Sequence, residues 1–444
     1  MPKYMSEKRA QFGTKIGVIM ATVGSAVGLG NIWRFPYECG TGGGAAFLIV
    51  YIAFVFLLGI PAICAEFALG RSSRKGMPLA YRNTAGNRRW DILGYASILA
   101  AFMILAFYAV VAGWTLEYIV DSATGLFKET PNAERHAQFT SFISGWRAVG
   151  WAVLFLVINA VVMLAGVVKG IERVSNILTP LLFLLLIVFC VNSLMMPGAA
   201  QGLEFMFKPD FSKLTTDVIL GALGQAFFSL SLGMGCLVTY SSYFSDDTPL
   251  IKTAIHISVL DTLVAIMAGV IIFPAVFSFG MSPAEGPTLV FEVLPNIFHN
   301  MPGGSVWSFL FFVLLALASL TSIISVSEIV VAFLCDEFRM SRKKATLIIT
   351  GISLVTATLC SLSFGPLASI DLFNIFDYVS SNILMPLGGM GICIFVGWKM
   401  ERGTYLEHMK RNACVPAFVF DYISVGIRYV APVCILIVFI AGLM

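Results

Sequence analysis

The stretch Gly24-Ser-Ala-Val-Gly-Leu-Gly-Asn-Ile-Trp-Arg-Phe-Pro36 decides how this chain folds. It lies in an apolar segment of membrane-spanning length, and Gly28 and Gly30 weaken the helix there. A broken helix leaves backbone N–H and C=O groups unpaired, and lipid cannot satisfy them. Irregular backbone therefore survives at membrane depth only where it lines a cavity or binds a ligand. The stretch predicts a binding site inside the membrane.

The composition is that of a polytopic membrane protein. Apolar residues make up 58% of the chain and charged residues only 12%, against roughly 25% charged residues in soluble domains. Eleven segments reach the ~18 residues that mark a spanning helix. They are residues 16–33, 45–65, 92–116, 148–168, 176–202, 218–245, 262–284, 305–327, 345–370, 378–398 and 422–444. We predict an all-α polytopic fold.

The basic residues indicate the orientation of these spans. Lys and Arg gather before span 1 and in the loops after spans 2, 8 and 10, and such loops are usually cytoplasmic. Eleven spans then place the N-terminus in the cytoplasm and the C-terminus outside. The short loops suggest a bacterial inner membrane. The net charge of +3 reflects this loop bias, so the lipid bilayer is an expected partner and nucleic acid is not.

A second glycine break, Gly233-Met-Gly235, lies five spans after the first. Paired broken helices suggest an inverted repeat with the ligands held between its halves. We expect an N-terminal repeat over residues 1–200, a C-terminal repeat over 201–400, and a cytoplasmic loop with span 11 over 401–444. The alternative is that these glycines only serve close helix packing. Their i, i+2 spacing and the neighbouring polar residues favour broken helices; those residues are Ser25, Asn31, Ser229 and Ser231.

Asp261 is an acid within an apolar span, which is costly and usually functional. It needs a cation, although a structural pairing with another residue is the alternative. Glu66 and Glu328 are further acids in apolar segments. For Glu66 we expect hydrogen bonds from the unwound backbone of span 6, and the role of Glu328 stays open.

The order of these motifs resembles the neurotransmitter:sodium symporter family, and within it the bacterial amino-acid branch. The resemblance rests on residues 24–36, the triple glycine 42–44, residues 227–235, Leu320-Thr-Ser322, and Asp336-Glu337 followed by Ser341-Arg-Lys343. It implies a LeuT-like fold with a five-plus-five inverted repeat and helices 1 and 6 unwound at mid-membrane. Two departures are Thr41 before the triple glycine and the absence of a twelfth helix.

The resemblance implies a site for an amino-acid zwitterion. Helix ends freed near Leu29 and Gly30 suit a carboxylate, and freed carbonyls suit an ammonium group and Na⁺. Tyr108 is expected to contact the carboxylate. The implied substrate-binding residues are Ser25, Ala26, Leu29, Gly30, Ile104, Tyr108, Phe228, Ser229, Ser231, Met234, Ser322 and Val326. The pocket residues are largely apolar, which favours neutral hydrophobic or aromatic amino acids.

The resemblance also implies two Na⁺ sites and no organic cofactor. The first combines Ala26, Asn31, Ser229 and Asp261 with the substrate carboxylate, and the second combines Gly24, Val27, Ala318, Thr321 and Ser322. Chloride-dependent relatives carry asparagine at the position of Asp261. Tyr51, Gln225 and Ser229 resemble the rest of the halide site of these relatives, and Ala265 stands where that site usually has a serine. A fixed carboxylate there predicts chloride-independent transport.

Alternating access needs two gates. Arg34 and Asp377 resemble an outer ion-pair gate, with Tyr108 and Phe228 as an aromatic lid. Arg9 and Asp336 resemble an inner latch supported by Phe12 and Tyr243. Taken singly, Arg9 and Asp336 are better explained as ordinary solvated charges, whereas Arg34 directly follows an apolar helix half and is harder to explain in that way.

The resulting hypothesis is a sodium-coupled symporter that imports neutral hydrophobic or aromatic L-amino acids. An enzyme is not expected, because no HxxxH, GxSxG or CxxC pattern occurs. A sodium-dependent channel is the main alternative, since broken helices also line pores. A transporter-derived amino-acid sensor is the third.

Overall fold

The computed structural model describes residues 10–125, 135–283, 290–291, 293–299, 301–413 and 415–443, and this part of the chain contains helices and no strand. The N-terminal half comprises α1 (Lys15–Ala26), α2 (Phe35–Thr41), α3 (Ala45–Phe54), α4 (Ile60–Ser73), α5 (Leu79–Ala85), α6 (Asp91–Thr124), α8 (Arg135–Ile143), α9 (Trp146–Leu164), α10 (Arg173–Leu194) and α11 (Ala199–Phe207). The C-terminal half comprises α12 (Thr216–Ser229), α13 (Cys236–Ser241), α14 (Leu250–Ser278), α15 (Val293–His299), α16 (Gly304–Phe338), α17 (Arg342–Leu362), α18 (Leu372–Tyr378), α19 (Met385–Ile394), α20 (Arg402–Lys410), α21 (Ala417–Val425) and α22 (Ala431–Leu443).

Nine helices of the described residues are long and apolar enough to cross a membrane, and a tenth span is a bent pair. In this pair, α1 and the segment Gly30–Thr41 meet at an angle of 50°. The helices α12 and α13 form a second interrupted segment, separated by residues 230–235. Both breaks lie where the glycine pattern predicts them, and the all-α polytopic fold class is confirmed.

Single π-helical turns precede several of the α-helices. They are η1 (Gly30–Arg34), η2 (Val55–Gly59), η7 (Val379–Leu384) and η9 (Gly426–Val430). Each is followed, two residues after its end, by a proline: Pro36, Pro61, Pro386 and Pro432. Proline has no N–H to donate to the preceding turn and its ring clashes with that turn, so a wider turn relieves the conflict.

The predicted span over residues 176–202 is too long. The helix α10 begins at Arg173 and ends at Leu194, and α11 is a separate helix that begins at Ala199. The sequence Met195-Met-Pro-Gly198 between them is apolar but cannot continue a helix, because proline lacks the required N–H. The proposed repeat boundary at residue 200 falls inside α11.

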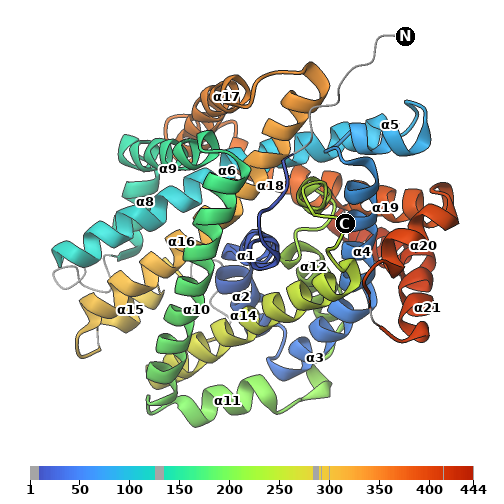
Figure 1. The fold of residues 1–444 in the computed structure, drawn as a ribbon. Coiled ribbons are helices and arrows are strands. Elements are labelled where there is room, and N and C mark those ends of the chain that lie inside the picture. The colour runs from blue at the N-terminus through green and yellow to red at the C-terminus, as the bar shows by residue number, and fades with distance from the viewer. Residues whose placement is uncertain are drawn as a thin grey trace.

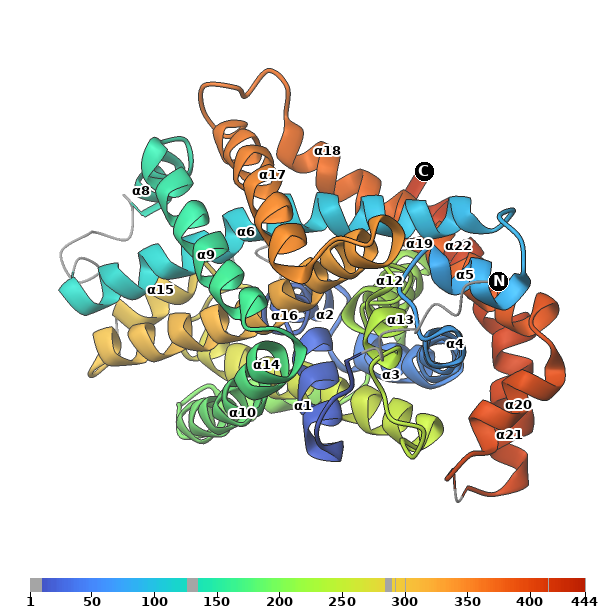
Figure 2. The same cartoon turned by 45° about the horizontal axis from the view of Figure 1, so that its top comes forward.

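The interrupted helices occupy the middle of the molecule. In Figures 1 and 2, α1, α2 and α12 lie centrally, with α6, α10, α14 and α16 around them, while α20 and α21 lie at the periphery. The long helices α6 and α16 pack against each other, and α1 packs against both α10 and α16. This arrangement places the two breaks inside the helix bundle, close to one another.

Candidate binding site

The break in the first span is stabilised by side chains from other helices. The helix α1 ends at Ala26, and Val27 has an extended backbone. The Ser322 hydroxyl donates to the Val27 carbonyl at 3.1 Å, and the Leu29 N–H donates to the Tyr108 hydroxyl at 3.2 Å. The freed backbone groups predicted from the glycine pattern therefore meet Ser322 of α16 and Tyr108 of α6.

The break in the sixth span has a strained backbone. Ser231, Gly233 and Gly235 have φ angles of 54°, 84° and 80°, a region that costs residues other than glycine strain energy. The Gly233 N–H donates to the Glu66 carboxylate at 2.8 Å, and the Ser97 hydroxyl donates to the Gly233 carbonyl at 2.9 Å. Glu66 thus accepts a hydrogen bond from the unwound backbone, as expected from the sequence.

A cavity of about 270 Å³ lies above the breaks. Four of the predicted substrate-binding residues line it: Leu29, Gly30, Tyr108 and Phe228. The cavity also contains residues that the sequence did not single out: Trp33, Tyr37, Phe107, Val111, Phe373, Ser381 and Asn382. Aromatic rings dominate this lining, so the cavity suits an apolar ligand with a small polar part.

Six further residues that we predict to bind substrate are buried and are not among those that line this cavity. Ala26, Ile104 and Met234 are each 6% exposed, and so is Val326. Ser322 is 7% exposed and Ser231 is 8% exposed. These residues come from α1, α6, α16 and the sixth-span break, yet they share a small remaining accessibility. They therefore lie inside the helix bundle.

Ser25 and Ser229 are also absent from the cavity lining. The Ser25 hydroxyl lies 2.9 Å from the Cys236 sulfur, and the Ser229 hydroxyl donates to Asp261 at 2.7 Å. Both hydroxyl groups are hydrogen-bonded within the protein in this structure.

Three of the four residues of the first predicted Na⁺ site, Asn31, Ser229 and Asp261, form one hydrogen-bonded cluster. The Asn31 amide donates to Ser229 at 2.9 Å and to Asp261 Oδ1 at 2.8 Å, while its oxygen accepts from the Gly28 N–H at 3.1 Å. Asp261 is completely buried. The cluster joins the first break, the sixth span and α14 through hard oxygen atoms, which are the ligands that Na⁺ prefers.

Tyr51 and Ser229, two residues of the predicted halide-like arrangement, contact Asp261. The Tyr51 hydroxyl donates to Asp261 Oδ2 at 3.4 Å, and Ala265 follows one helical turn after Asp261. Gln225 Nε2 donates to the Gly30 carbonyl at 2.9 Å, and its buried Oε1 has no partner among the described residues. The carboxylate of Asp261 therefore lies next to the groups that the resemblance associates with chloride.

The residues of the second predicted Na⁺ site lie where α1 meets α16. A Cβ atom on Gly24 would lie 3.3 Å from Thr321 Cβ, so these two residues are in contact. The Thr321 hydroxyl donates to the Ala318 carbonyl at 3.0 Å, and Ser322 bonds to Val27 as described above. All five predicted residues thus lie at one junction, with carbonyl and hydroxyl oxygens as potential ligands.

The predicted outer gate residues lie on the cavity wall but do not pair with each other. Arg34 forms an ion pair with Glu38 at 3.3 Å, and its guanidinium lies 4.7 Å from the centre of the Phe228 ring. Asp377 accepts from the Ser381 hydroxyl at 3.0 Å. No ion pair joins Arg34 to Asp377 within the described ranges. Both residues line the cavity.

At the opposite end of α1 the residues are closely packed. Arg9 lies outside the described residues. Asp336 accepts from Lys75 at 2.9 Å and from the Gly76 N–H at 3.0 Å. Phe12 packs its ring edge-on against Tyr240 and Tyr243. The inner gate residues that the structure describes are thus engaged in contacts.

Glu328 is part of the same packed region. Its carboxylate accepts from the Tyr243 hydroxyl at 2.5 Å and forms an ion pair with Arg342 at 2.5 Å. Glu328 is completely buried, so removal of Arg342 would leave its carboxylate charge uncompensated. The sequence alone left the role of Glu328 open.

Comparison with known proteins agrees with this geometry. The family model "Sodium:neurotransmitter symporter family" matches residues 9–136 and 134–444. An "Uncharacterized sodium-dependent transporter YhdH" from Bacillus subtilis is 39% identical, with 98% of each chain covered. A sodium- and chloride-dependent GABA transporter 2 from Bos taurus is 28% identical, over 91% of this chain and 75% of the relative. A solved structure of MhsT in complex with L-phenylalanine superimposes with a TM-score of 0.90 at 41% identity, covering 98% of this chain and all of the other.

These comparisons establish the class of protein. It is a multi-pass membrane transporter and not an enzyme. The chain belongs to the sodium:neurotransmitter symporter family, whose members are sodium-dependent transporters.

Proposed function

We propose that this protein is a sodium-coupled symporter that imports neutral hydrophobic or aromatic L-amino acids by alternating access. The observation that carries the proposal is the position of the Asn31–Ser229–Asp261 cluster next to the backbone freed at the first break. A substrate carboxylate near Leu29 and Gly30 would lie close to a Na⁺ ion at this cluster. Ion and substrate would then stabilise each other directly.

Several features support the substrate class. The cavity is lined by aromatic rings, and Met234 and Val326, which we predict to contact the substrate side chain, are buried and apolar. The cavity lining offers no charge for an ionised substrate side chain other than Arg34 and Asp377. The match to MhsT, which was solved with L-phenylalanine, supports the same class. Met234 is deformable, so aliphatic and aromatic side chains are both compatible with it.

The proposal includes two Na⁺ ions, held by the Asp261 cluster and by the junction of Gly24 with Thr321. It also includes an inner-membrane location with a cytoplasmic N-terminus. Transport is proposed to be independent of chloride, because the Asp261 carboxylate supplies a fixed negative charge beside Tyr51 and Ser229.

Uptake into proteoliposomes tests the proposal. An inward Na⁺ gradient should drive accumulation of labelled L-phenylalanine or L-leucine above the external concentration, and an equal K⁺ gradient should not. Competition by all twenty amino acids should show displacement by neutral hydrophobic ones. Displacement only by lysine or glutamate would refute the substrate class.

The same experiment separates the symporter from its alternatives. A channel equilibrates its substrate and cannot accumulate it, so uphill uptake excludes a channel. A sensor would bind substrate in a sodium-dependent manner without any uptake.

A further inference from the structure

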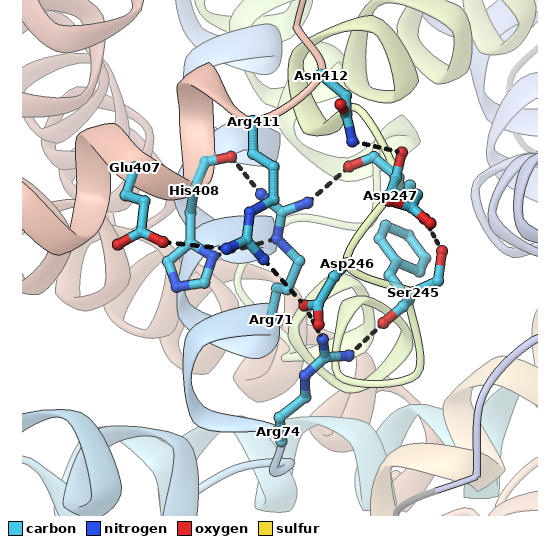
Figure 3. Close-up of polar contacts among 11 residues, drawn as sticks. Arg71, Arg74, Ser245, Asp246, Asp247, Glu407, His408, Arg411 and Asn412 are labelled. Atoms are coloured by element: carbon cyan, nitrogen blue, oxygen red, sulfur yellow. Dashed lines mark hydrogen bonds and ion pairs between the residues drawn. The ribbon is translucent and has the colours of Figure 1, made fainter.

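A cluster of charged residues joins three elements at the end of the molecule away from the cavity (Figure 3). Arg71 and Arg74 come from the end of α4, Asp246 comes from the loop between α13 and α14, and His408 and Arg411 come from α20 and its C-terminus. We call these five residues the α20 clamp.

Arg71 forms the buried centre of the clamp. It is only 1% exposed, although the sequence suggests a solvent-exposed basic residue at the end of a membrane span. Its guanidinium donates to the Thr248 carbonyl at 2.6 Å, to the His408 ring nitrogen Nδ1 at 3.3 Å, and to the His408 carbonyl. All three acceptors are neutral. If Arg71 lost one of these acceptors, a buried N–H donor would be left unsatisfied, which destabilises the folded state.

The outer layer of the clamp fixes the loop between α13 and α14. Arg74 donates to the Phe244 carbonyl and to Asp246, and Arg411 lies 3.4 Å from the same Asp246 carboxylate. Asn412, next to Arg411, donates to the Asp247 carbonyl at 3.3 Å. Residues 244–248 are therefore held from one side by α4 and from the other by α20.

This loop continues directly from α13, the second half of the broken sixth span. Cys236 at the start of α13 contacts Ser25 at the end of α1, with 2.9 Å between sulfur and hydroxyl oxygen. If α13 moved away from α1 to open the site towards this end, residues 244–248 would have to leave Arg71, Arg74 and Arg411. The clamp therefore opposes such an opening.

We propose that the α20 clamp holds α13 in its closed position, and that its release is a step in opening to the cytoplasm. The proposal rests on the alternating access of the proposed function and assigns Asp246 and α20 a positioning role in it. Through the clamp, α20 in the loop after span 10 contacts the loop after α13. None of the gate residues named above lies in α20.

Alkylation of Cys236 tests the clamp without transport. Cys236 is 1% exposed, and Cys39, Cys64 and Cys393 are 0%, 0% and 1% exposed. The full-length protein in detergent, in K⁺ without Na⁺ or amino acid, is treated with N-ethylmaleimide, and each cysteine is followed by peptide mass spectrometry. Opening between α1 and α13 exposes Cys236 alone, whereas unfolding exposes all four.

The test variants are Asp246→Asn and Asn412→Ala, both of which change exposed side chains on the loop and beside α20. Loss of the partly exposed Asp246 ion pairs, or of the hydrogen bond from Asn412 to the Asp247 carbonyl, should raise the alkylation rate of Cys236 by ~2- to 5-fold and leave the other three rates unchanged. The matched control is Glu204→Gln, since Glu204 is also an exposed carboxylate in an ion pair, 2.6 Å from Lys208. It should have no effect.

An unchanged Cys236 rate in both variants would overturn the proposal, and so would a parallel rise in all four cysteines. Because the assay contains neither substrate nor gradient, its result is independent of whether uptake is sodium-driven. Failure of the clamp and failure of the proposed function are therefore separate outcomes.

Discussion

Asp261 shows how one side chain can join ion binding to the fold. Its carboxylate accepts from Asn31 at the first break, from Ser229 in the sixth span and from Tyr51 on α3. A buried carboxylate with these donors but no basic partner among the described residues lacks a compensating positive charge. A bound Na⁺ ion would supply it.

We expect Asp261→Asn to weaken the sodium dependence of transport. Loss of a charged ligand should raise the half-saturating Na⁺ concentration ~10-fold or more, and chloride should partly restore activity by replacing the lost negative charge. Uptake measured across a Na⁺ series, with chloride or gluconate as the anion, checks both effects. In the unaltered protein the two anions should give equal rates.

Asp217→Asn is the control for this change, because Asp217 is an exposed acid at the start of α12. It should leave both the Na⁺ dependence and the anion response unchanged. A variant Asp261→Asn with normal Na⁺ affinity would rule out a direct role of this carboxylate.

At the scale of elements, the break in the sixth span depends on Gly233. Its φ angle is +84°, and a Cβ atom there would lie 2.0 Å from the Met385 carbonyl oxygen. Both the backbone conformation and the contact with α19 exclude a side chain. We expect Gly233→Ala to destabilise the protein by ~1–3 kcal/mol or more.

Gly351→Ala is the matched substitution. Gly351 lies within α17, and nothing lies within 4 Å of its Cβ position. Alanine there should be neutral or stabilise the helix by up to ~1 kcal/mol. Thermal unfolding of the two purified variants in detergent, followed by size-exclusion chromatography, compares them. Equal melting temperatures would contradict the explanation given for Gly233.

We expect the stability of the protein to depend on pH through His408 of α20. Burial and the neighbouring Arg71 charge lower the pKa of His408 to about 4 from its usual value of about 6.5. Between these values the unfolded chain binds a proton that the folded chain does not, so stability falls as pH falls. The contribution of His408 is fully present above pH ~6.5 and is lost on acidification towards pH 4.

His408→Gln keeps a hydrogen-bond acceptor for Arg71 and removes the titrating group. We expect its melting temperature to decrease less between pH 7 and pH 5 than that of the unaltered protein. The comparison uses thermal unfolding in detergent at several pH values. Identical pH profiles would show that His408 does not titrate in this range.

The sequence predicted the two helix breaks, because glycines inside an apolar span conflict with a continuous helix. It also grouped Asn31, Ser229 and Asp261, because their positions match a family motif. It did not predict the burial of Arg71 or the pair of Glu328 with Arg342, since these depend on which loops fold back onto which helix ends. Apolar content alone also missed the end of α10 before Pro197.

At the scale of the whole molecule, the residues near the two ends of the described chain lie in different regions. The Phe12 N–H donates to the Tyr243 carbonyl at 3.1 Å, close to the α20 clamp. The Tyr378 hydroxyl donates to the Gly442 carbonyl at 2.9 Å, next to Asp377 of the cavity wall. We predict from this separation that the chain crosses the membrane an odd number of times.

We therefore expect a reporter fused after Met444 to lie outside the cytoplasm. Alkaline phosphatase, which is active only after export, should be active in this fusion, and green fluorescent protein should not fluoresce there. The control places the same reporters after Arg411, in the loop that contains α20, where the pattern should reverse. The same pattern at both sites would contradict eleven spans.

The helix α14 connects two regions that have so far been treated separately. It begins at Leu250, directly after the clamped loop, and carries Asp261 eleven residues later, a distance of about 16 Å along a stiff rod. Binding equilibria are reciprocal: if fastening the loop favours the arrangement that captures Na⁺, the captured ion must fasten the loop by the same factor. The bound cation would then stabilise the clamped loop without contacting it.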